Sequence, residues 1–414
     1  MNEWMPMTMT DTKRLEVLTL VRARRITGRQ AASLLGRSLR TIRYRLARLK
    51  AEGPRGLLHR LRGRPSHHRK PDGVRRRALT LAATLYAGLN DSHLWEKLTE
   101  VERLRLSRPT LRRWLRAAGR PSPQRRRPPR HRRCRPRRPQ MGLMLLGDGS
   151  SHAWLEARGP VFDLVAFIDD ATSTVVVARF VESESTEAYL GLLRDLGRTH
   201  GLPHSLYVDR HSAFKTTRHH LTVEEELEGR AHATQVDRAL QELGIMHLSA
   251  YSPQAKGRIE RLWKTFQDRL VSELRLAGVT TMAEANRVLA WVRRDHNRRF
   301  AVPPVEAQAA WRPAPALADL DRICAWAFPS VVGHDNCVRL LRQVVQIPPG
   351  PRRRSYAKAH VEVRILLDGR WQVWYQGQRL LDRRVAPMRQ LRPHLQARDD
   401  WHATGHRPAH REAA

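Results

Sequence analysis

The chain has 414 residues, enough for two to four domains that each bury a core. Its 76 Lys and Arg against 40 Asp and Glu give a formal net charge of +36, which attracts a polyanion, most commonly nucleic acid. Three cysteines are too few for a disulfide framework or a zinc site. The first residues carry no signal-peptide pattern, and the most apolar stretch is too short to cross a bilayer. We therefore expect an intracellular nucleic-acid-binding protein with no membrane partner.

Residues 11–60 are predicted to form an all-α helix-turn-helix DNA-binding domain of three short helices. Ala32 is small enough for two helices to touch, Gly36 permits a tight turn, and Ile42 packs the last helix back on the second. Ser38 suits the N-cap of that last helix. A small helical domain with a solvated basic face is the alternative. The residues expected to face a DNA major groove are Arg40, Arg43 and Arg45.

Residues 74–119 are predicted to form a second helical domain, which resembles a helix-turn-helix at its end. Ser107 is a plausible N-cap, and Leu111, Trp114 and Leu115 are spaced for one buried face. The preceding turn lacks a glycine, so a helical hairpin with only a packing role remains open. In the DNA-binding interpretation, the contacts come from Arg112 and Arg113.

Residues 120–140 form a basic linker with ten arginines and no acidic residue. Such a segment cannot bury a core and should be extended when free. We interpret it as a tether that follows DNA phosphates, with a solvated spacer as the alternative.

Residues 141–300 change to a pattern of apolar runs of strand length. The predicted order is three strands, a helix, a strand, a helix, a strand and a helix. This order indicates a central α/β domain with a mixed sheet. The predicted strands are 142–148, 162–169, 175–181, 206–209 and 245–249. The predicted helices are 186–199, 236–243, 256–276 and 281–297.

Residues 325–390 contain short alternating runs broken by Asp368-Gly369 and Gln376-Gly377, which are typical of hairpin turns. We expect a small C-terminal β-barrel there, followed by a frayed tail from about residue 391. The predicted fold class is therefore multidomain: N-terminal all-α helix-turn-helix regions, a central α/β mixed sheet and a C-terminal small β-barrel.

Three acids stand out by position. Asp148 ends the first predicted strand, Asp209 ends the fourth, and Glu260 lies one turn into a long helix. A helix laid across adjacent strand ends can bring three such carboxylates together, and they repel one another unless divalent cations bridge them. The arrangement favours a pair of magnesium ions that promotes phosphoryl transfer. A strand-end aspartate taken alone is more often a turn residue.

Lys256 and Lys264 flank Glu260 on the same helical face at spacings of four residues. Cations beside a metal-binding acid suit a surface that receives a DNA backbone, while two surface salt bridges are the alternative. Gly257 near the helix start indicates that something approaches closely.

Other polar residues near these acids receive different interpretations. Asp169 and Asp170 are read as turn formers. Asp268 lies two turns beyond Glu260, too far to share its metal. The polar stretch 214–234 is predicted to be an insertion that projects beside the acids, with a metal site at its histidines disfavoured by their irregular spacing.

Several motifs together carry a resemblance to a known family. They are Gly147-Asp148-Gly149-Ser150, Tyr207-Val208-Asp209-Arg210, and the run from Tyr251 through Ser252-Pro253-Gln254-Ala255-Lys256-Gly257-Arg258 to Glu260. On these residues the chain resembles the ISNCY-like DDE transposases, within the retroviral-integrase-like superfamily, over nearly its whole length. The resemblance departs at Leu262-Trp263-Lys264, where smaller polar residues are expected.

The resemblance implies an RNase H-like integrase catalytic core with Asp148, Asp209 and Glu260 as the metal-binding triad. It also implies Mg²⁺ or Mn²⁺, two ions in all, with element ends and target as the double-stranded DNA partners and a homo-oligomer assembled on that DNA. The expected location is the bacterial cytoplasm, in association with the nucleoid. Two rivals remain: a catalytically retired transposase that acts as a DNA-binding regulator, and a nuclease of the same fold.

Overall fold

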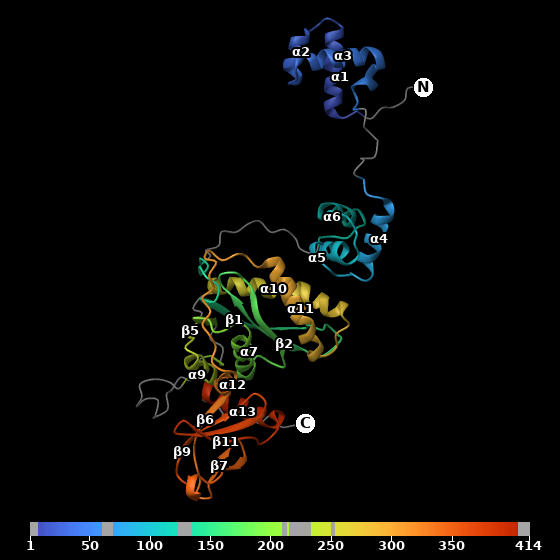
Figure 1. Cartoon of the computed structure of the whole chain (residues 1–414). Helices are drawn as coiled ribbons and strands as arrows, with labels where there is room; N and C mark the ends of the chain where they lie inside the picture. The colour runs from blue at the N-terminus through green and yellow to red at the C-terminus, as the bar shows by residue number, and fades with distance from the viewer. Residues whose placement is uncertain are drawn as a thin grey trace. The chain divides into compact units, whose positions relative to one another are not determined.

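The computed structural model describes residues 7–59, 69–122, 135–208, 213–214, 233–249 and 253–404. The chain divides into two compact units, residues 1–76 and 77–414, which are considered separately. Figure 1 shows the elements of both along the chain.

The first unit is the three-helix domain expected from the sequence. Its helices are α1 (Met9–Arg22), α2 (Gly28–Leu35) and α3 (Leu39–Glu52), followed by the 3₁₀ turn η1 (Gly53–Leu57). Gly36 ends α2 with a φ of 59°, a left-handed conformation that glycine adopts at little cost, and Ser38 caps α3 by accepting from the Thr41 amide. Ile42 is fully buried, and Ala32 is partly buried and packs against the same apolar cluster. The predicted helix-turn-helix geometry is confirmed.

A helical segment opens the second unit. It contains α4 (Asp72–Ala83), which begins in the first unit, α5 (Asp91–Glu96), the π-helical turn η2 (Lys97–Val101) and α6 (Arg108–Ala117). Ser107 caps α6, and Leu111 and Leu115 are buried as predicted, whereas Trp114 is only partly buried.

A five-stranded mixed sheet forms the centre of the second unit, with strand order β3-β2-β1-β4-β5. The strands are β1 (Met144–His152), β2 (Phe162–Asp169), β3 (Val175–Val181), β4 (Ser205–Val208) and β5 (Met246–Ser249). The first three form an antiparallel meander, while β4 runs parallel to β1 and β5 parallel to β4. The strands follow one another along the chain as predicted, but β1 continues four residues beyond Asp148.

Helices cover both faces of this sheet (Figure 1). They are α7 (Thr186–Thr199), α9 (Gln235–Glu242), α10 (Pro253–Leu276) and α11 (Met282–Phe300). Leu145 and Val208 share a buried cluster with α7 and α9. Leu146, on the other face of β1, shares a second cluster with Ile259 of α10. Alternate residues of one strand thus supply two cores, which produces a three-layer arrangement.

The helical segment packs against α10 and α11 through polar contacts. The Arg269 guanidinium donates to both carboxylate oxygens of Glu96 at 2.8 and 2.7 Å. Glu273 lies 2.6 Å from His93 and 2.7 Å from Lys97, so its carboxylate is enclosed by basic side chains from the segment. These contacts give the segment a packing role, which was one of the two interpretations left open by the sequence.

The C-terminal region contains two open sheets. One has the order β11-β10-β9-β6, and the other is the hairpin β7-β8. The elements are α12 (Leu317–Ile323), β6 (Trp326–Val331), β7 (Cys337–Leu340), β8 (Gln343–Gln346), η3 (Pro351–Arg353), β9 (His360–Ile365), β10 (Arg370–Tyr375), β11 (Gln378–Arg384) and α13 (Met388–Thr404).

The predicted closed β-barrel is therefore wrong. Closure would require the edge strands β6 and β11 to pair, but β6 pairs only with β9 and β11 only with β10. Pro329 in β6 has no amide hydrogen to donate. Instead, α13 contributes Leu391 and Leu395 to the buried core. Residues 391–404, which we expected to belong to a frayed tail, thus continue α13, whose apolar residues pack on this sheet, while residues 405–414 lie outside the described residues.

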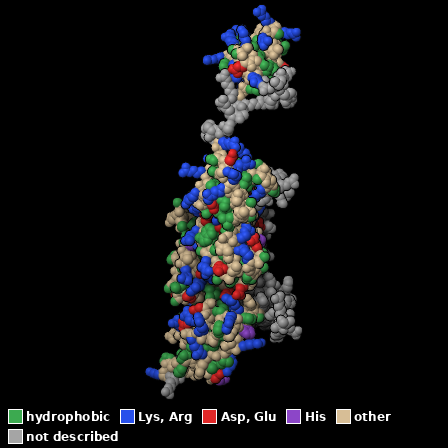
Figure 2. Space-filling view, turned by 90° about the vertical axis from the view of Figure 1, so that its right-hand side faces the viewer, with side chains coloured by type: hydrophobic (Ala, Val, Ile, Leu, Met, Phe, Trp, Pro, Cys, Tyr) green, Lys and Arg blue, Asp and Glu red, His purple; other side chains and the backbone are tan. Residues whose placement is uncertain are grey.

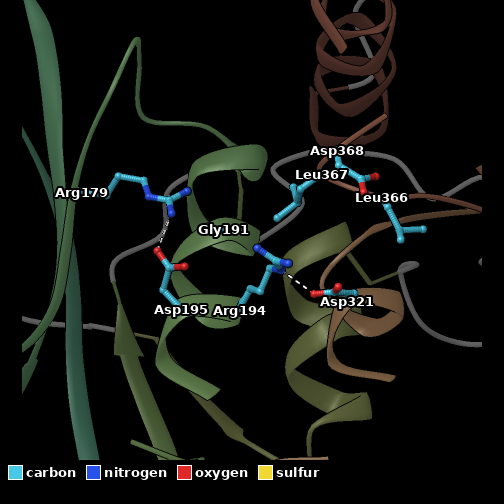
Figure 3. A pocket seen from close by; sticks show the side chains of 8 residues that line it. All are labelled: Arg179, Gly191, Arg194, Asp195, Asp321, Leu366, Leu367 and Asp368. Atoms are coloured by element: carbon cyan, nitrogen blue, oxygen red, sulfur yellow. Dashed lines mark hydrogen bonds and ion pairs between the residues drawn. The ribbon is translucent and has the colours of Figure 1, made fainter. Parts of the chain in front are cut away.

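The C-terminal sheet shares its core with the α7 side of the central sheet, since Val363 and Ile365 belong to the same cluster as Leu145. Ion pairs border this junction, with Arg194 of α7 2.5 Å from Asp321 of α12. Figure 3 shows this pair beside a cavity of about 200 Å³. The cluster and the ion pair fix the C-terminal sheet to the central domain.

Candidate active site

Asp148 lies inside β1, where its backbone pairs with that of Ala166 in β2. The prediction that Asp148 ends the strand is wrong, because β1 continues to His152. The indole Nε1 of Trp263 in α10 donates to Asp148 Oδ2 at 2.9 Å. Two residues along β1, Ser150 Oγ accepts from Gln267 Nε2 at 3.3 Å. The side chain of Asp148 is therefore on the α10 face of the sheet, and it is half-buried.

The glycines on both sides of Asp148 face the opposite side of β1. A Cβ on Gly147 would lie 2.8 Å from the Phe167 ring and 2.9 Å from Val208 Cγ1. A Cβ on Gly149 would lie 2.1 Å from a carboxylate oxygen of Glu184. The Phe167 ring and Val208 are packed in the core and cannot move away easily, so position 147 requires glycine, whereas a side chain at position 149 would displace the carboxylate end of Glu184. The Gly-Asp-Gly motif thus lets β1 run between two packed layers while it presents Asp148 to α10.

Glu260 is exposed on α10, three residues before Trp263. Successive helix residues are about 100° apart around the axis. Because Ile259 points into the core and is fully buried, Arg258 and Glu260 lie on opposite flanks of the helix. Arg258 reaches Asp170, directly after β2, so Glu260 is on the flank directed toward β4.

Asp209 lies outside the described residues, and it follows Val208, the last residue of β4. Strand β4 runs parallel to β1 with Tyr207 opposite Leu146. Leu206 and Val208 belong to the α7 cluster, and Tyr207 packs against the α10 cluster. Among the described residues, which do not include Asp209, no group of three or more His, Cys, Asp and Glu could hold a metal ion. Only Asp148 and Glu260 of the predicted triad have described positions.

Asp169 has the turn-forming role predicted for it. Its carboxylate accepts the amides of Thr172 at 2.8 Å and Gly142 at 2.9 Å, which closes the turn between β2 and β3. Burial raises the pKa of this carboxyl, although the hydrogen bonds from Gly142 and Thr172 oppose the rise. With no exposed surface and these donors in place, Asp169 is a structural acid.

Asp170 does more than form a turn. It is fully buried and lies 2.5 Å from guanidinium nitrogens of both Arg135 and Arg258. The amide of Arg138 donates to its other oxygen at 2.8 Å. No local pattern in the sequence indicates this cluster, because Arg135 and Arg258 are 35 and 88 residues away from Asp170.

Comparisons with known proteins assign the chain to a family. A helix-turn-helix domain model matches residues 13–66. The Sinorhizobium fredii (strain NBRC 101917 / NGR234) protein named "Putative transposase y4bF" is 36% identical over 371 residues, which cover 89% of this chain and 80% of that protein. The chain belongs to the insertion-sequence transposases.

Two further similarities accompany this assignment. The "Transposase for insertion sequence IS1202" of Streptococcus pneumoniae is 28% identical over 327 residues, which cover 70% of this transposase and 69% of that protein. A chain of the cryoEM structure of simian T-cell lymphotropic virus intasome in complex with PP2A regulatory subunit B56 gamma aligns with 75% of the transposase and 99% of that chain, at 15% identity and a TM-score of 0.27.

The helix-turn-helix of the transposase exposes Arg40 and Arg43 on α3, as predicted. Arg45 was expected on the same face but is half-buried, and its Nη1 is enclosed with no hydrogen-bond partner in the described residues. Burial and the neighbouring charges of Arg14 and Arg37 lower the pKa of its guanidinium. Tyr44, which follows Arg43 on α3, is 58% exposed and was not among the predicted contacts, because an aromatic residue in a helix more often belongs to the core.

The remaining predicted DNA contacts of the transposase differ in their surroundings. Arg113 and Lys264 are exposed. Arg112 is also exposed, and its Nε lies 3.6 Å from the Asp91 carboxylate, so an acidic side chain of the protein already balances part of its charge. The side chain of Lys256 lies outside the described residues. Figure 2 shows Lys and Arg side chains spread over the viewed face, with fewer Asp and Glu among them.

Of the predicted insertion at 214–234, the structure describes Phe214 at one end and residues 233–234 at the other, so the insertion itself stays a prediction. Phe214 is 2% exposed and its ring centroid lies 4.4 Å from that of Tyr189, so it belongs to the core. Thr234 caps α9 and donates to the Ala213 carbonyl at 2.7 Å, which brings the two ends of the segment together. Residues 215–232 lie outside the described residues.

The described helices of the transposase include none long and apolar enough to cross a membrane.

The packing around Gly147 predicts a stability loss on substitution. Gly147→Ala should lower the free energy of unfolding by about 1–3 kcal/mol, because the added methyl group forces Phe167 or Val208 to move. Gly257→Ala is the matched control: nothing lies within 4 Å of its Cβ position, so it should stabilise α10 by about 0.5–1 kcal/mol. Urea unfolding followed by tryptophan fluorescence measures both. Equal effects from the two substitutions would contradict the packing argument.

Proposed function

We propose that this transposase cleaves the ends of its insertion sequence and joins them to target DNA by phosphoryl transfer, with Asp148, Asp209 and Glu260 as metal-binding acids. The observation that carries the proposal is the contact between Trp263 and Asp148, which sets α10 across β1. Glu260, three residues earlier, lies on the flank opposite Arg258, which is the flank toward β4, and Asp209 is the residue that follows β4.

The donor set fits Mg²⁺, or Mn²⁺ in its place. Carboxylate oxygens are the ligands that such hard cations prefer, and three carboxylates close together need cations to offset their repulsion. Asp148 is half-buried and Glu260 is exposed, so ions and DNA can reach them from solvent. A bound pair of ions would activate the attacking oxygen and stabilise the leaving oxygen in an in-line displacement.

The chain's own residues would position the DNA. Helix α3 would read the element ends through Arg40 and Arg43, and Lys264 with Lys256 would contact phosphates beside Glu260. Hydrolysis by water and attack by the freed 3′-OH are both phosphoryl transfers, so one set of acids can serve both steps. Because two element ends must be held side by side while both are joined to the target DNA, we propose that the transposase acts as a homo-oligomer on DNA.

Neutralising the acids tests the proposal directly. Asp148→Asn and Glu260→Gln should each keep the fold and the affinity for element ends but reduce cleavage and strand transfer by about a hundredfold or more, since the amide no longer holds a cation. Glu182→Gln, a change at an exposed glutamate outside the site, is the control. Gel assays on end-containing DNA with Mg²⁺ measure both steps. Parental joining by either variant would rule out the triad, and a parent that never cleaves would favour the retired regulator.

The indole contact predicts a second effect. Trp263→Phe keeps an aromatic ring in the α10 core but removes the donor to Asp148, so one carboxylate oxygen loses its fixed orientation. We expect cleavage to slow by about tenfold and the Mg²⁺ concentration for half-maximal activity to rise. Trp154→Phe is the control, since that indole donates to the Ser150 backbone carbonyl on the same strand. Equal effects from both changes would assign the contact to stability alone.

The two basic regions should contribute differently to DNA binding. Replacing Arg40 and Arg43 with Ala should weaken binding to element ends more than to random DNA, because groove contacts specify sequence. Neutralising the arginines between residues 125 and 133, which leaves the contacts of Arg135, Arg137 and Arg138 with the Asp170 turn in place, should weaken both alike and flatten the salt dependence. Fluorescence anisotropy at several salt concentrations separates the two patterns. An equal loss of specificity from both sets would refute this division.

A further inference from the structure

The cluster around Asp170 joins three segments that are distant in sequence. Asp170 follows β2, Arg135 and Arg138 belong to the end of the predicted basic linker, and Arg258 belongs to α10. Arg258 Nη1 donates to Asp170 Oδ1 at 2.5 Å, while its Nη2 donates to the backbone carbonyl of Arg135, also at 2.5 Å. Arg258 thus bridges the turn and the linker with one planar guanidinium.

The linker is held at further points. Arg137 Nη1 donates to the backbone carbonyls of Asp170 at 2.9 Å and Ala171 at 3.1 Å, and to Ser173 Oγ at 2.9 Å. The Arg138 amide donates to Asp170 Oδ2 at 2.8 Å. Since every partner is on the turn after β2, residues 135–138 are fixed to the same turn that holds α10.

The position of Arg258 makes this cluster relevant to Glu260. The two residues are separated by Ile259 alone, and they lie on opposite flanks of the helix. Rotation of the α10 turn that contains Arg258 and Glu260 would break the Arg258 contacts on one flank and expose the buried Ile259 between the two residues. Asp170 is fully buried, so loss of its charge would leave two guanidinium groups without their shared partner.

We propose that Asp170 and Arg258 are positioning residues whose ion pair, completed by Arg135, fixes the turn of α10 that carries Glu260 to the end of the basic linker. This rests on the proposed role of Glu260 as a metal-binding acid. The consequence is a mechanical link between the DNA-tethering segment and the acid, because the same guanidinium contacts both the linker backbone and the turn after β2.

Arg258→Gln in the full-length transposase tests the link. Mn²⁺ affinity, measured by calorimetry without DNA, should fall about tenfold, as is usual when an outer partner of a metal ligand is lost. The Mg²⁺ concentration for half-maximal cleavage at saturating DNA should rise in parallel. Arg258→Lys should restore part of the Mn²⁺ affinity and of the Mg²⁺ dependence, since lysine keeps the positive charge but cannot contact Asp170 and the Arg135 carbonyl with one planar group. Unchanged Mn²⁺ affinity, or a slower cleavage at an unchanged Mg²⁺ requirement, overturns the proposal.

A matched control and a second variant complete the design. Asp321→Asn breaks an Asp–Arg pair of the same 2.5 Å length at the junction in Figure 3, and it should leave Mn²⁺ affinity and the Mg²⁺ requirement at parental values. If Arg258→Gln fails to fold, Arg135→Gln decides, because it leaves the Asp170–Arg258 pair in place. A smaller loss of Mn²⁺ affinity supports the proposal, and no loss overturns it.

Limited trypsin digestion reports on the linker independently of metal binding. In Arg258→Gln, cleavage between Arg137 and Arg138 should be faster than in the parent, and parental rates would overturn the link. If the triad assignment fails instead, Asp148→Asn and Glu260→Gln bind Mn²⁺ and cleave like the parent, while the trypsin difference persists. The two failures are therefore distinguishable.

Discussion

The packing of α10 across β1 is the constraint on which the candidate site depends. Ile259, Trp263 and Phe266 are buried in the cluster that covers one face of the sheet, so the helix cannot slide or rotate without exposing large apolar side chains. The burial of these three side chains places the Trp263 indole beside Asp148 and leaves Glu260 on the exposed flank of the helix. Ordinary hydrophobic packing therefore orients polar groups that contribute nothing to the core themselves.

The acids near this helix differ in what surrounds them. Asp169 is saturated by backbone and hydroxyl donors, and Asp170 is enclosed by guanidinium groups, while neither has exposed surface. A metal ion must reach its ligands from solvent, and complete burial with charged partners removes that possibility. Asp148 and Glu260 keep exposed surface, which separates them from their neighbours. Accessibility and partners distinguish the four acids, whereas sequence position alone does not.

The local patterns of the sequence predicted much of the central domain. Strands β2 and β3 and helix α7 have the predicted bounds, because each has an apolar run of its own period with polar residues at its ends. The Gly-Asp-Gly motif misled the prediction for β1, since glycine beside aspartate is typical of a turn. The two glycines are explained by tertiary packing instead, because Phe167, Val208 and Glu184 occupy the space that side chains at positions 147 and 149 would need. The open C-terminal sheet was equally invisible, because strand pairing and the cover provided by α13 involve residues far apart in sequence.

The net charge of +36 overstates the basic surface that is free to meet DNA. Arg364 is 4% exposed and donates to Glu242 and Glu362, and Arg312 donates to the backbone carbonyls of Pro203, Leu243 and Gly244. Arginine suits such work because its planar fork can satisfy several acceptors at once and stays charged when partly buried. The same property lets Arg258 hold a carboxylate and a backbone carbonyl together. In this transposase, arginine thus acts in two separate ways, as an internal brace between distant segments and as an exposed cation. Burial and partners of each arginine, rather than their number, determine which of the two roles it has.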